Sequence, residues 1–91
     1  MSRVYGEPVD VVVSGGRPVR FVWRGQLYVV RRVLEHWVTT REWRRRVDRE
    51  AEGPTERRFW RIEAVTGDQV GVYELRLDTA TGRWLLSRAW D

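Results

Sequence analysis

The sequence contains no cysteine and only one histidine, and these two shortages exclude several kinds of site. Without cysteine the chain can form no disulfide, no thiolate metal site and no thiol nucleophile. With His36 as the sole imidazole, a metal site built on two histidines is excluded as well. Glu35 and His36 are neighbours, and neighbours on a strand point to opposite faces, so they cannot act on one group. We therefore expect His36 to be a packing or interface residue.

Long apolar runs are also missing. Residues 1–8 contain no apolar segment of the kind that a signal peptide needs. The longest apolar runs elsewhere are far too short to span a bilayer. The expectation is a soluble cytoplasmic protein without a membrane partner.

Recognisable signatures of catalysis are absent. The glycines match neither a phosphate-binding loop nor a dinucleotide fingerprint. The acids Asp10, Glu63, Glu74 and Asp78 could in principle supply a carboxylate pair. Each lies on an expected polar strand face or in a turn, however, where arginines are available as partners. We expect no enzyme, no catalytic residue, no metal and no cofactor; a deep polar pocket around His36 would instead favour a small hydrolase or ligand-binding barrel.

Lysine is missing as well, so all seventeen basic residues are arginines. A GC-rich genome is one explanation. Recognition of phosphates or stacked bases is the other, because the planar guanidinium fork suits both. The net charge of +4 is modest, and its positive excess lies in the first two-thirds of the chain. This distribution permits a polyanionic partner without requiring one.

What the chain has in abundance is valine and tryptophan. Its 91 residues make one domain, residues 1–91, and a domain this small needs large side chains in its core. Six tryptophans, three tyrosines and two phenylalanines supply them. The excess of β-branched and aromatic residues favours strands over helices.

Alternation of apolar and polar residues predicts six strands. They cover residues 9–13, 19–24, 27–40, 59–65, 73–78 and 83–90. Strands that follow one another through short turns favour an antiparallel meander, so we expect an all-β fold, either a six-stranded small barrel or a strongly curled sheet.

The third predicted strand, residues 27–40, breaks its alternation at Arg31 and Arg32. A bulge at this point would let more of its apolar side chains reach the interior. The side chains concerned are Tyr28, Val30, Val33 and Trp37.

The last two strands form the clearest hairpin. Asp78 and Gly82 bound a turn, with Gly82 suited to a positive φ. In the final strand, alternation places Trp84, Leu86 and Trp90 on one face. We expect this hairpin to close the core.

Residues 41–58 form a charged insertion between the third and fourth strands. Twelve of these eighteen residues are charged, and Gly53-Pro54 interrupts them. Oppositely charged residues at helical spacing would allow a short helix over residues 41–50. A loop is an equal alternative.

The insertion holds the strongest candidate binding residues. Arginines there could hold phosphates through bidentate bonds, and the flanking Trp43 and Phe59 could stack on bases. The arginines are Arg44, Arg45, Arg46, Arg49, Arg57 and Arg58. The alternative is a solvated loop, since five acids in the same stretch offset most of the charge.

The tryptophans suggest a second kind of interface. Six indoles are more than a small core easily hides, and tryptophan is common at interface hot spots. Trp43 and Trp90, at the ends of their strands, are the candidates for contact with a partner or a second copy of the chain. Packing of all six in or around the core is the alternative.

Four segments together carry a family resemblance: residues 3–9 (RVYGEPV), 17–43 (RPVRFVWRGQLYVVRRVLEHWVTTREW), 57–64 (RRFWRIEA) and 72–91 (VYELRLDTATGRWLLSRAWD). They resemble a family of short, uncharacterised actinobacterial proteins, a domain of unknown function. Phe59-Trp60 and the C-terminal hairpin are also similar to the tail of ImuB-like proteins, non-catalytic relatives of Y-family polymerases in bacterial mutagenic DNA repair. That resemblance implies an accessory module in damage tolerance, with no catalytic residue to carry over.

The leading hypothesis is thus a non-enzymatic binding module that contacts nucleic acid or a repair protein through an arginine and tryptophan surface. The rival is a protein–protein or homodimer module without nucleic-acid affinity, which would use an exposed strand edge or a tryptophan. Steep salt dependence of binding would separate the two.

Overall fold

The computed structural model describes residues 2–42 and 54–90, and the regular structure in these ranges is β-strand. No helix in the described part of the chain has the length and apolarity needed to cross a membrane. The strands are β1 (Ser2–Pro8), β2 (Asp10–Ser14), β3 (Arg17–Trp23), β4 (Gln26–Glu42), β5 (Pro54–Thr66), β6 (Gln69–Asp78) and β7 (Arg83–Trp90).

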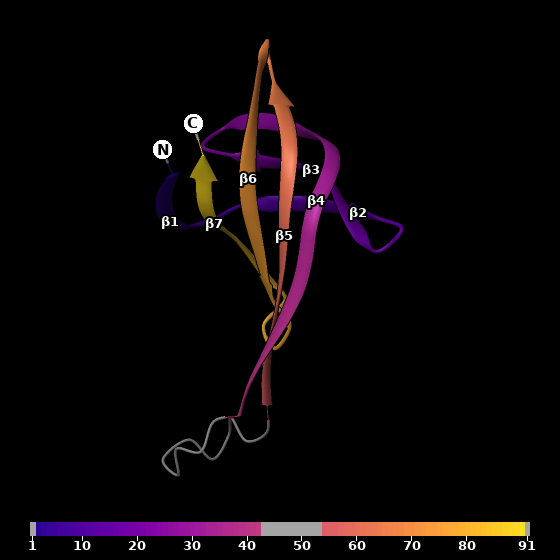
Figure 1. The fold of residues 1–91 in the computed structure, drawn as a ribbon, viewed down its shortest axis with the longest axis vertical. Helices are drawn as coiled ribbons and strands as arrows, with labels where there is room; N and C mark the ends of the chain where they lie inside the picture. The colour runs from indigo at the N-terminus through magenta and orange to yellow at the C-terminus, as the bar shows by residue number, and fades with distance from the viewer. Residues whose placement is uncertain (1, 43–53, 91) are drawn as a thin grey trace.

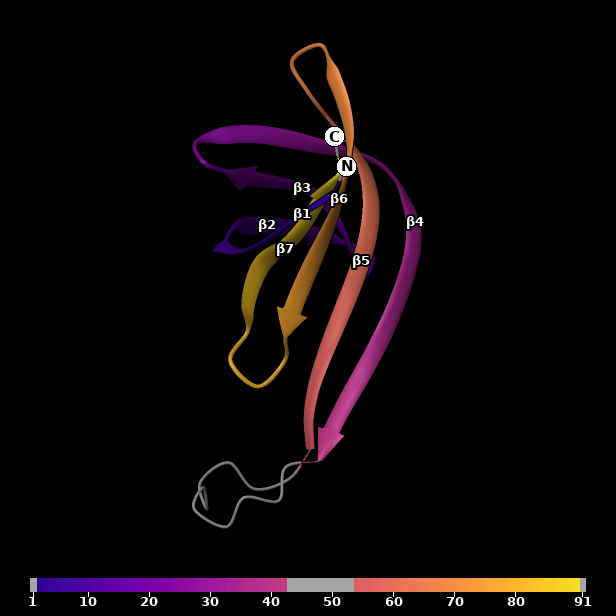
Figure 2. The ribbon, with the colours of Figure 1, turned by 60° about the vertical axis from the view of Figure 1, so that its left-hand side comes forward.

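All seven strands belong to one antiparallel sheet with the order β1-β7-β6-β5-β4-β3-β2. From β2 to β7 each strand pairs with the next one in the chain, as in a meander. β1 instead pairs with β7, so Ser2 lies opposite Trp90 and the two ends of the chain are neighbours (Figure 1). The long hairpin of β4 and β5 extends well beyond the other strands (Figures 1 and 2).

The all-β prediction is confirmed, but the strand count of six is wrong, and of the two predicted forms, a small barrel or a strongly curled sheet, the barrel is wrong. The additional strand is β1, and the sheet is open because β1 and β2 form its two edges. Only Val9 separates these two strands, so the sheet must curl until its edges meet. The Val9 N–H donates to the Trp84 carbonyl at 3.2 Å and fastens the crossing point to β7.

A charged cluster ties β1 to the turn between β3 and β4. The Glu7 carboxylate accepts hydrogen bonds from Arg24 Nε (2.9 Å), Arg24 Nη2 (2.7 Å) and Trp23 Nε1 (2.9 Å). These bonds, from Arg24 first and Trp23 second, lower the pKa of Glu7, and the same pair raises the pKa of Arg24. Arg24 adopts a positive φ of 53° in this two-residue turn, with Gly25 at 77°. The ion pair holds Arg24 in a conformation that few non-glycine residues adopt.

The core lies on the inner face of the curled sheet. Phe21, Ile62, Leu75 and Leu86 are at most 1% exposed. Around them pack Val9, Trp23, Tyr28, Trp60 and Ala64, and the rings of Phe21 and Tyr28 stack at 4.8 Å with an interplanar angle of 2°. Burial raises the pKa of the Tyr28 hydroxyl. Large aromatic side chains thus fill much of the core of this small chain.

β4 confirms the predicted irregularity near Arg31 and contains a second one. The register with β5 shifts between Val30 and Arg32, and again between Val33 and Glu35. Tyr28, Val30 and Val33 reach the core as predicted. Trp37 does not, because the second shift moves it to the outer face, opposite Phe59.

The hairpin of β6 and β7 has the predicted turn. Gly82 has a φ of 72°, and its N–H donates to the Asp78 carbonyl at 2.8 Å. A register shift between Glu74 and Leu75 then offsets the end of β7 by one residue. Trp84 and Leu86 face the core, but Ala89 takes the next inward position and Trp90 lies on the outer face. The expectation that Trp90 shares the face of Trp84 and Leu86 is therefore wrong.

The charged insertion is shorter than predicted. β4 continues to Glu42 and β5 begins at Pro54, and these two residues are paired. The beginning of the alternative helix over 41–50 is therefore strand, and residues 43–53 lie outside the described residues. The expected candidates Arg57 and Arg58 belong to β5 and not to an insertion.

Candidate nucleic-acid interface

The outer face of β4–β7 gathers aromatic and charged side chains. One row across the sheet runs Glu35, Arg61, Glu74, Arg88, as the strand registers show. Together with three aromatic neighbours, these residues make up what we call the outer-face cluster: Glu35, Trp37, Phe59, Arg61, Glu74, Arg88 and Trp90. The cluster forms because arginine and aromatic residues occupy the positions of each strand that alternate with the core positions.

Trp37 of β4 and Phe59 of β5 lie opposite each other and form a stacked pair. Their ring centroids are 5.2 Å apart and their planes differ by 3°. Both side chains are partly exposed. Partly exposed aromatic rings on a sheet can stack with a nucleobase, whatever its identity.

Arg61 lies between the two tryptophans. Its guanidinium carbon is 5.4 Å from the ring centroid of Trp37 and 4.8 Å from that of Trp90. Its Nη1 pairs with Glu35 Oε1 at 2.6 Å, and its Nη2 lies 3.7 Å from Glu74 Oε1. Two carboxylates therefore balance this arginine, and its main effect is to hold the tryptophan rings in place.

Glu74 anchors the middle of the cluster. It is only 9% exposed, and its Oε2 accepts a hydrogen bond from the Ser87 hydroxyl at 2.8 Å. Ser87 lies in β7 at the register shift that also turns Trp90 outward. The irregularity thus supplies a partner for a nearly buried carboxylate and creates the aromatic edge of the cluster.

Arg83 and Arg88 provide positive charge that no carboxylate of the described residues pairs with. Within the described residues, neither forms an ion pair, and Arg88 lies 5.9 Å over the ring of Trp90. By contrast, Arg57 and Arg76 both approach Asp78 Oδ1, at 3.4 and 3.3 Å. Arg83 and Arg88 are accordingly the outer-face cations that can take up a phosphate without first losing a partner.

His36 lies beside the cluster and contacts the core side. Its ring stacks on Trp60 at 4.5 Å, and its Nδ1 is 2.9 Å from the Phe59 carbonyl. Because a carbonyl can only accept, Nδ1 carries the proton in this contact. The surface around His36 and Arg61 is a broad, open depression. Such a shape gives no enclosed polar pocket at this position.

The structure brings together only some of the residues predicted from the sequence. Trp90 joins the outer-face cluster, and Phe59 stacks there as a candidate for base contact. Arg57 lies on the same face, whereas Arg58 lies on the side of Trp60 and pairs with Glu56 at 3.0 Å. The remaining candidates lie outside the described residues: Trp43, Arg44, Arg45, Arg46 and Arg49.

Sequence reasoning missed Trp37, Arg61 and Arg88 as members of a site. Arg61 could have been found, because it alternates with Trp60 and Ile62 and so had to lie outside with Phe59. Trp37 was assigned to the core because the second shift in β4 has no signal in composition.

A comparison with protein families gives one match. The model of a family described as "Domain of unknown function (DUF6504)" matches residues 1–91. The searches of curated proteins and of solved structures give no match.

Proposed function

Since the chain belongs to the DUF6504 family, its function has to be argued from geometry, and we propose that it is a non-enzymatic module that binds single-stranded nucleic acid on the outer face of β4–β7. The observation that carries this proposal is the stacked, partly exposed Trp37–Phe59 pair beside Arg61 and Trp90. Bases would stack on the aromatic rings, and phosphates would contact Arg83 and Arg88.

The face suits a single strand better than a duplex. Aromatic stacking requires bases that are not paired and stacked within a helix. The arginines lie on the same face of the sheet as the rings, as backbone and base contacts of one strand require. Because most cations of the face already have carboxylate partners, we expect moderate affinity without sequence preference.

The proposed setting is the cytoplasm of a bacterium, in tolerance of DNA damage. This setting rests on the similarity of Phe59-Trp60 and the C-terminal hairpin to the tail of ImuB-like proteins. The two aromatics of that motif have separate positions: Phe59 lies on the outer face, and Trp60 lies in the core. Of the two, only Phe59 is available for a base.

Fluorescence titration with short single-stranded and double-stranded DNA tests the proposal. Trp37 and Trp90 supply the signal, because stacking of a base quenches an indole. We expect saturable binding of the single strand that weakens with salt. Absence of binding at low salt would overturn the proposal.

Paired variants locate the contact. Arg83→Ala with Arg88→Ala should weaken binding about tenfold and reduce the salt dependence. Arg3→Ala with Arg20→Ala removes the same charge from β1 and β3 and should have a smaller effect. Equal effects of the two pairs would mean that net charge, and not this face, attracts the nucleic acid. A variant with Arg44, Arg45, Arg46 and Arg49 changed to Ala tests whether the segment outside the described residues contributes.

The alternative function is a protein–protein or homodimer module without nucleic-acid affinity. The observation that favours it is an exposed edge of β4: beyond Val29 this strand pairs with β5 but not with β3. Sedimentation analysis over a range of concentrations separates a homodimer from a monomer that binds another protein.

A further inference from the structure

β4 has an exposed edge that is longer than either end strand of the sheet. Its ladder with β3 covers only Gln26–Val29, whereas its ladder with β5 continues to Glu42. From Val30 to Thr40, therefore, β4 is hydrogen-bonded on one side only (Figure 2). About every second residue of this segment directs its N–H and C=O away from β5, where no described strand pairs with it. Such an edge can accept another strand.

The second half of this edge is regular. Both register shifts of β4 fall before Glu35, and bulges of this kind often protect an edge from pairing. From Glu35 to Thr40 each residue then pairs in order with one residue of β5. Val38, on this part of the edge, is 46% exposed. Leu34, the residue that precedes Glu35, is 41% exposed. Six residues without irregularity are long enough for a short peptide strand.

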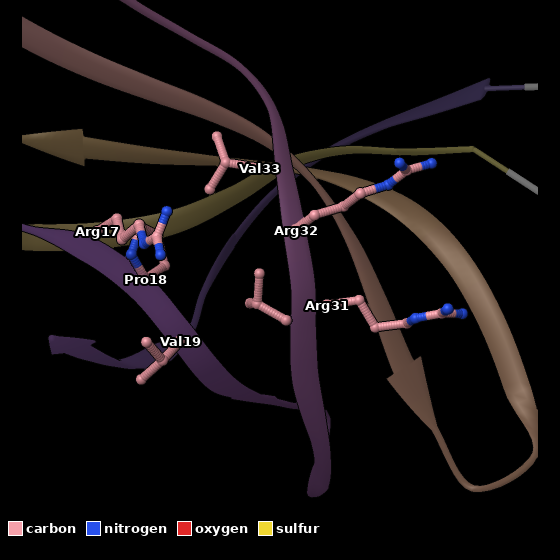
Figure 3. A pocket seen from close by; sticks show the side chains of 7 residues that line it. Arg17, Pro18, Val19, Arg31, Arg32 and Val33 are labelled. Atoms are coloured by element: carbon pink, nitrogen blue, oxygen red, sulfur yellow. The ribbon is translucent and has the colours of Figure 1, made fainter. Parts of the chain in front are cut away.

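A pocket lies next to the start of the edge, where β3 and β4 separate. It has a volume of about 330 Å³ and is lined by residues 17–19 of β3 and 30–33 of β4. Figure 3 shows Val33 directed toward the side of Pro18 and Val19, while Arg31 and Arg32 extend away from it. Its lining combines Pro18 and three valines with three arginines, and its volume has room for an aliphatic side chain of a strand that lies along β4.

Arginines lie on both sides of this part of the edge. Arg17 and Arg31 are exposed, and neither forms an ion pair with any residue in the described ranges. Arg32 is held by Glu63 at 2.7 Å, and Glu35, the sole acid between Val30 and Thr40, is held by Arg61. The edge therefore favours an acidic partner. A second copy of the same edge would bring like charges together.

From these observations we infer that the free edge of β4 binds an extended peptide segment of another protein, rich in aspartate or glutamate and carrying an aliphatic anchor. The peptide adds a strand beside residues 30–40. Its anchor enters the pocket between β3 and β4, and its acids pair with Arg17 and Arg31. The edge includes Glu35 and Trp37 of the outer-face cluster, but the peptide pairs with backbone groups and with Arg17 and Arg31, so the inference does not depend on the nucleic-acid proposal.

The test is fluorescence anisotropy with a labelled eight-residue peptide in which valine alternates with glutamate, in the absence of nucleic acid. We expect saturable binding by the full chain. A peptide with lysine in place of glutamate should bind at least about tenfold more weakly. A peptide with N-methyl groups on alternate backbone nitrogens should not bind, because it cannot form the ladder.

Two variants locate the peptide. Arg17→Glu with Arg31→Glu should weaken binding at least about tenfold. Arg3→Glu, a charge reversal on the edge strand β1, should change it less than about threefold. A larger loss in Arg3→Glu would place the peptide on β1 and overturn the inference. Circular dichroism of each variant confirms that the sheet is retained.

Three further results would overturn the inference: equal binding of the N-methylated peptide, equal or tighter binding of the lysine peptide, or no binding of the glutamate peptide at millimolar concentration. A dimer that forms without peptide and is abolished by Arg17→Glu with Arg31→Glu would also overturn it, because the occupant would then be a second copy. Failure of DNA binding in the earlier titration leaves these results unaffected, so the two proposals fail separately.

Discussion

The two faces of β4–β7 use aromatic residues in opposite ways. On the inner face, Tyr73 packs edge-on against Phe21 and Tyr28, around side chains that water does not reach. On the outer face, Trp37 and Phe59 stack flat and remain partly exposed, with arginines beside them. The same strands supply both sets by alternation. The difference teaches that stability and recognition can be changed separately in this small sheet, one face at a time.

The largest effect on stability is expected from the inner face. Leu75 is 0% exposed, and Leu75→Ala should lower the free energy of unfolding by about 2–5 kcal/mol, because it leaves a cavity in the core. Val70→Ala, on the same strand at a side chain that is 52% exposed, is the control and should change it by less than about 0.5 kcal/mol. Urea unfolding followed by tryptophan fluorescence measures both. Equal effects would contradict the assignment of faces.

The second prediction concerns space within the inner face. A Cβ at Gly71 would lie 2.7 Å from the Tyr73 hydroxyl oxygen and 3.0 Å from its Cζ. Because the Tyr73 ring is packed against Phe21 and Tyr28, Gly71→Ala should destabilise the fold by about 1–3 kcal/mol. Gly6→Ala, where the added methyl would meet nothing within 4 Å, is the matched control. Thermal melts of both variants decide the question, and an unchanged Tm in Gly71→Ala would show that Tyr73 moves at little cost.

A smaller effect on stability is expected from the outer face. Phe59→Ala removes the stack with Trp37 and should cost about 0.5–1.5 kcal/mol of stability. Its effect on single-stranded DNA should be larger, about tenfold in affinity, since a stacking platform is lost. Leu75→Ala, measured under conditions where it stays folded, should bind DNA normally. The reverse pattern would show that the outer aromatics serve only packing.

The smallest effect is expected from the exposed Glu7–Arg24 pair. The pKa of Glu7 is lowered from 4.5, so the pair contributes stability above pH 4.5 that is lost as the pH falls through the lower, folded pKa. Glu7→Gln should therefore be less stable than the wild type at pH 7. The gap should close as the pH is lowered through and below 4.5. Urea unfolding at a series of pH values measures it, and a gap that does not depend on pH would contradict the ion pair as its cause.

How much of this fold could be predicted depends on where alternation holds. β3, β5 and β6 alternate cleanly, and the sequence assigned their inward residues, among them Phe21, Ile62 and Leu75, correctly. β1 was missed because Gly6 and Pro8 interrupt its seven residues and its register shifts between Val4 and Glu7. Local pattern also cannot show that β1 pairs with β7, because that contact joins the two ends of the chain.

The candidate site was harder to predict than the fold. Trp37 was assigned inward, and Trp90 was placed on the face of Trp84 and Leu86 although it was also a candidate for partner contact. Each is turned outward by a one-residue irregularity in its strand. The bulge at Arg31 interrupts the alternation of β4, but these two irregularities depend on the partner strand and leave no such mark in the sequence. Runs of charged residues instead suggested Arg44, Arg45, Arg46 and Arg49 as the binding residues, and these lie outside the described residues. Arg61, the residue that joins the two tryptophans, was visible only as one polar position among many.

Because a single residue separates β1 from β2, the register of each strand pair in the sheet depends on the registers of the others. Hydrogen bonds leave the sheet open, but the covalent chain closes it into a ring through Val9. A slip of one residue between β1 and β7 would pull β2 along β3, and both strands would exchange their inner and outer side chains. This closed arrangement therefore permits only strand registers that are consistent with one another around the whole sheet. An extra residue beside Val9 is the change that would release this constraint.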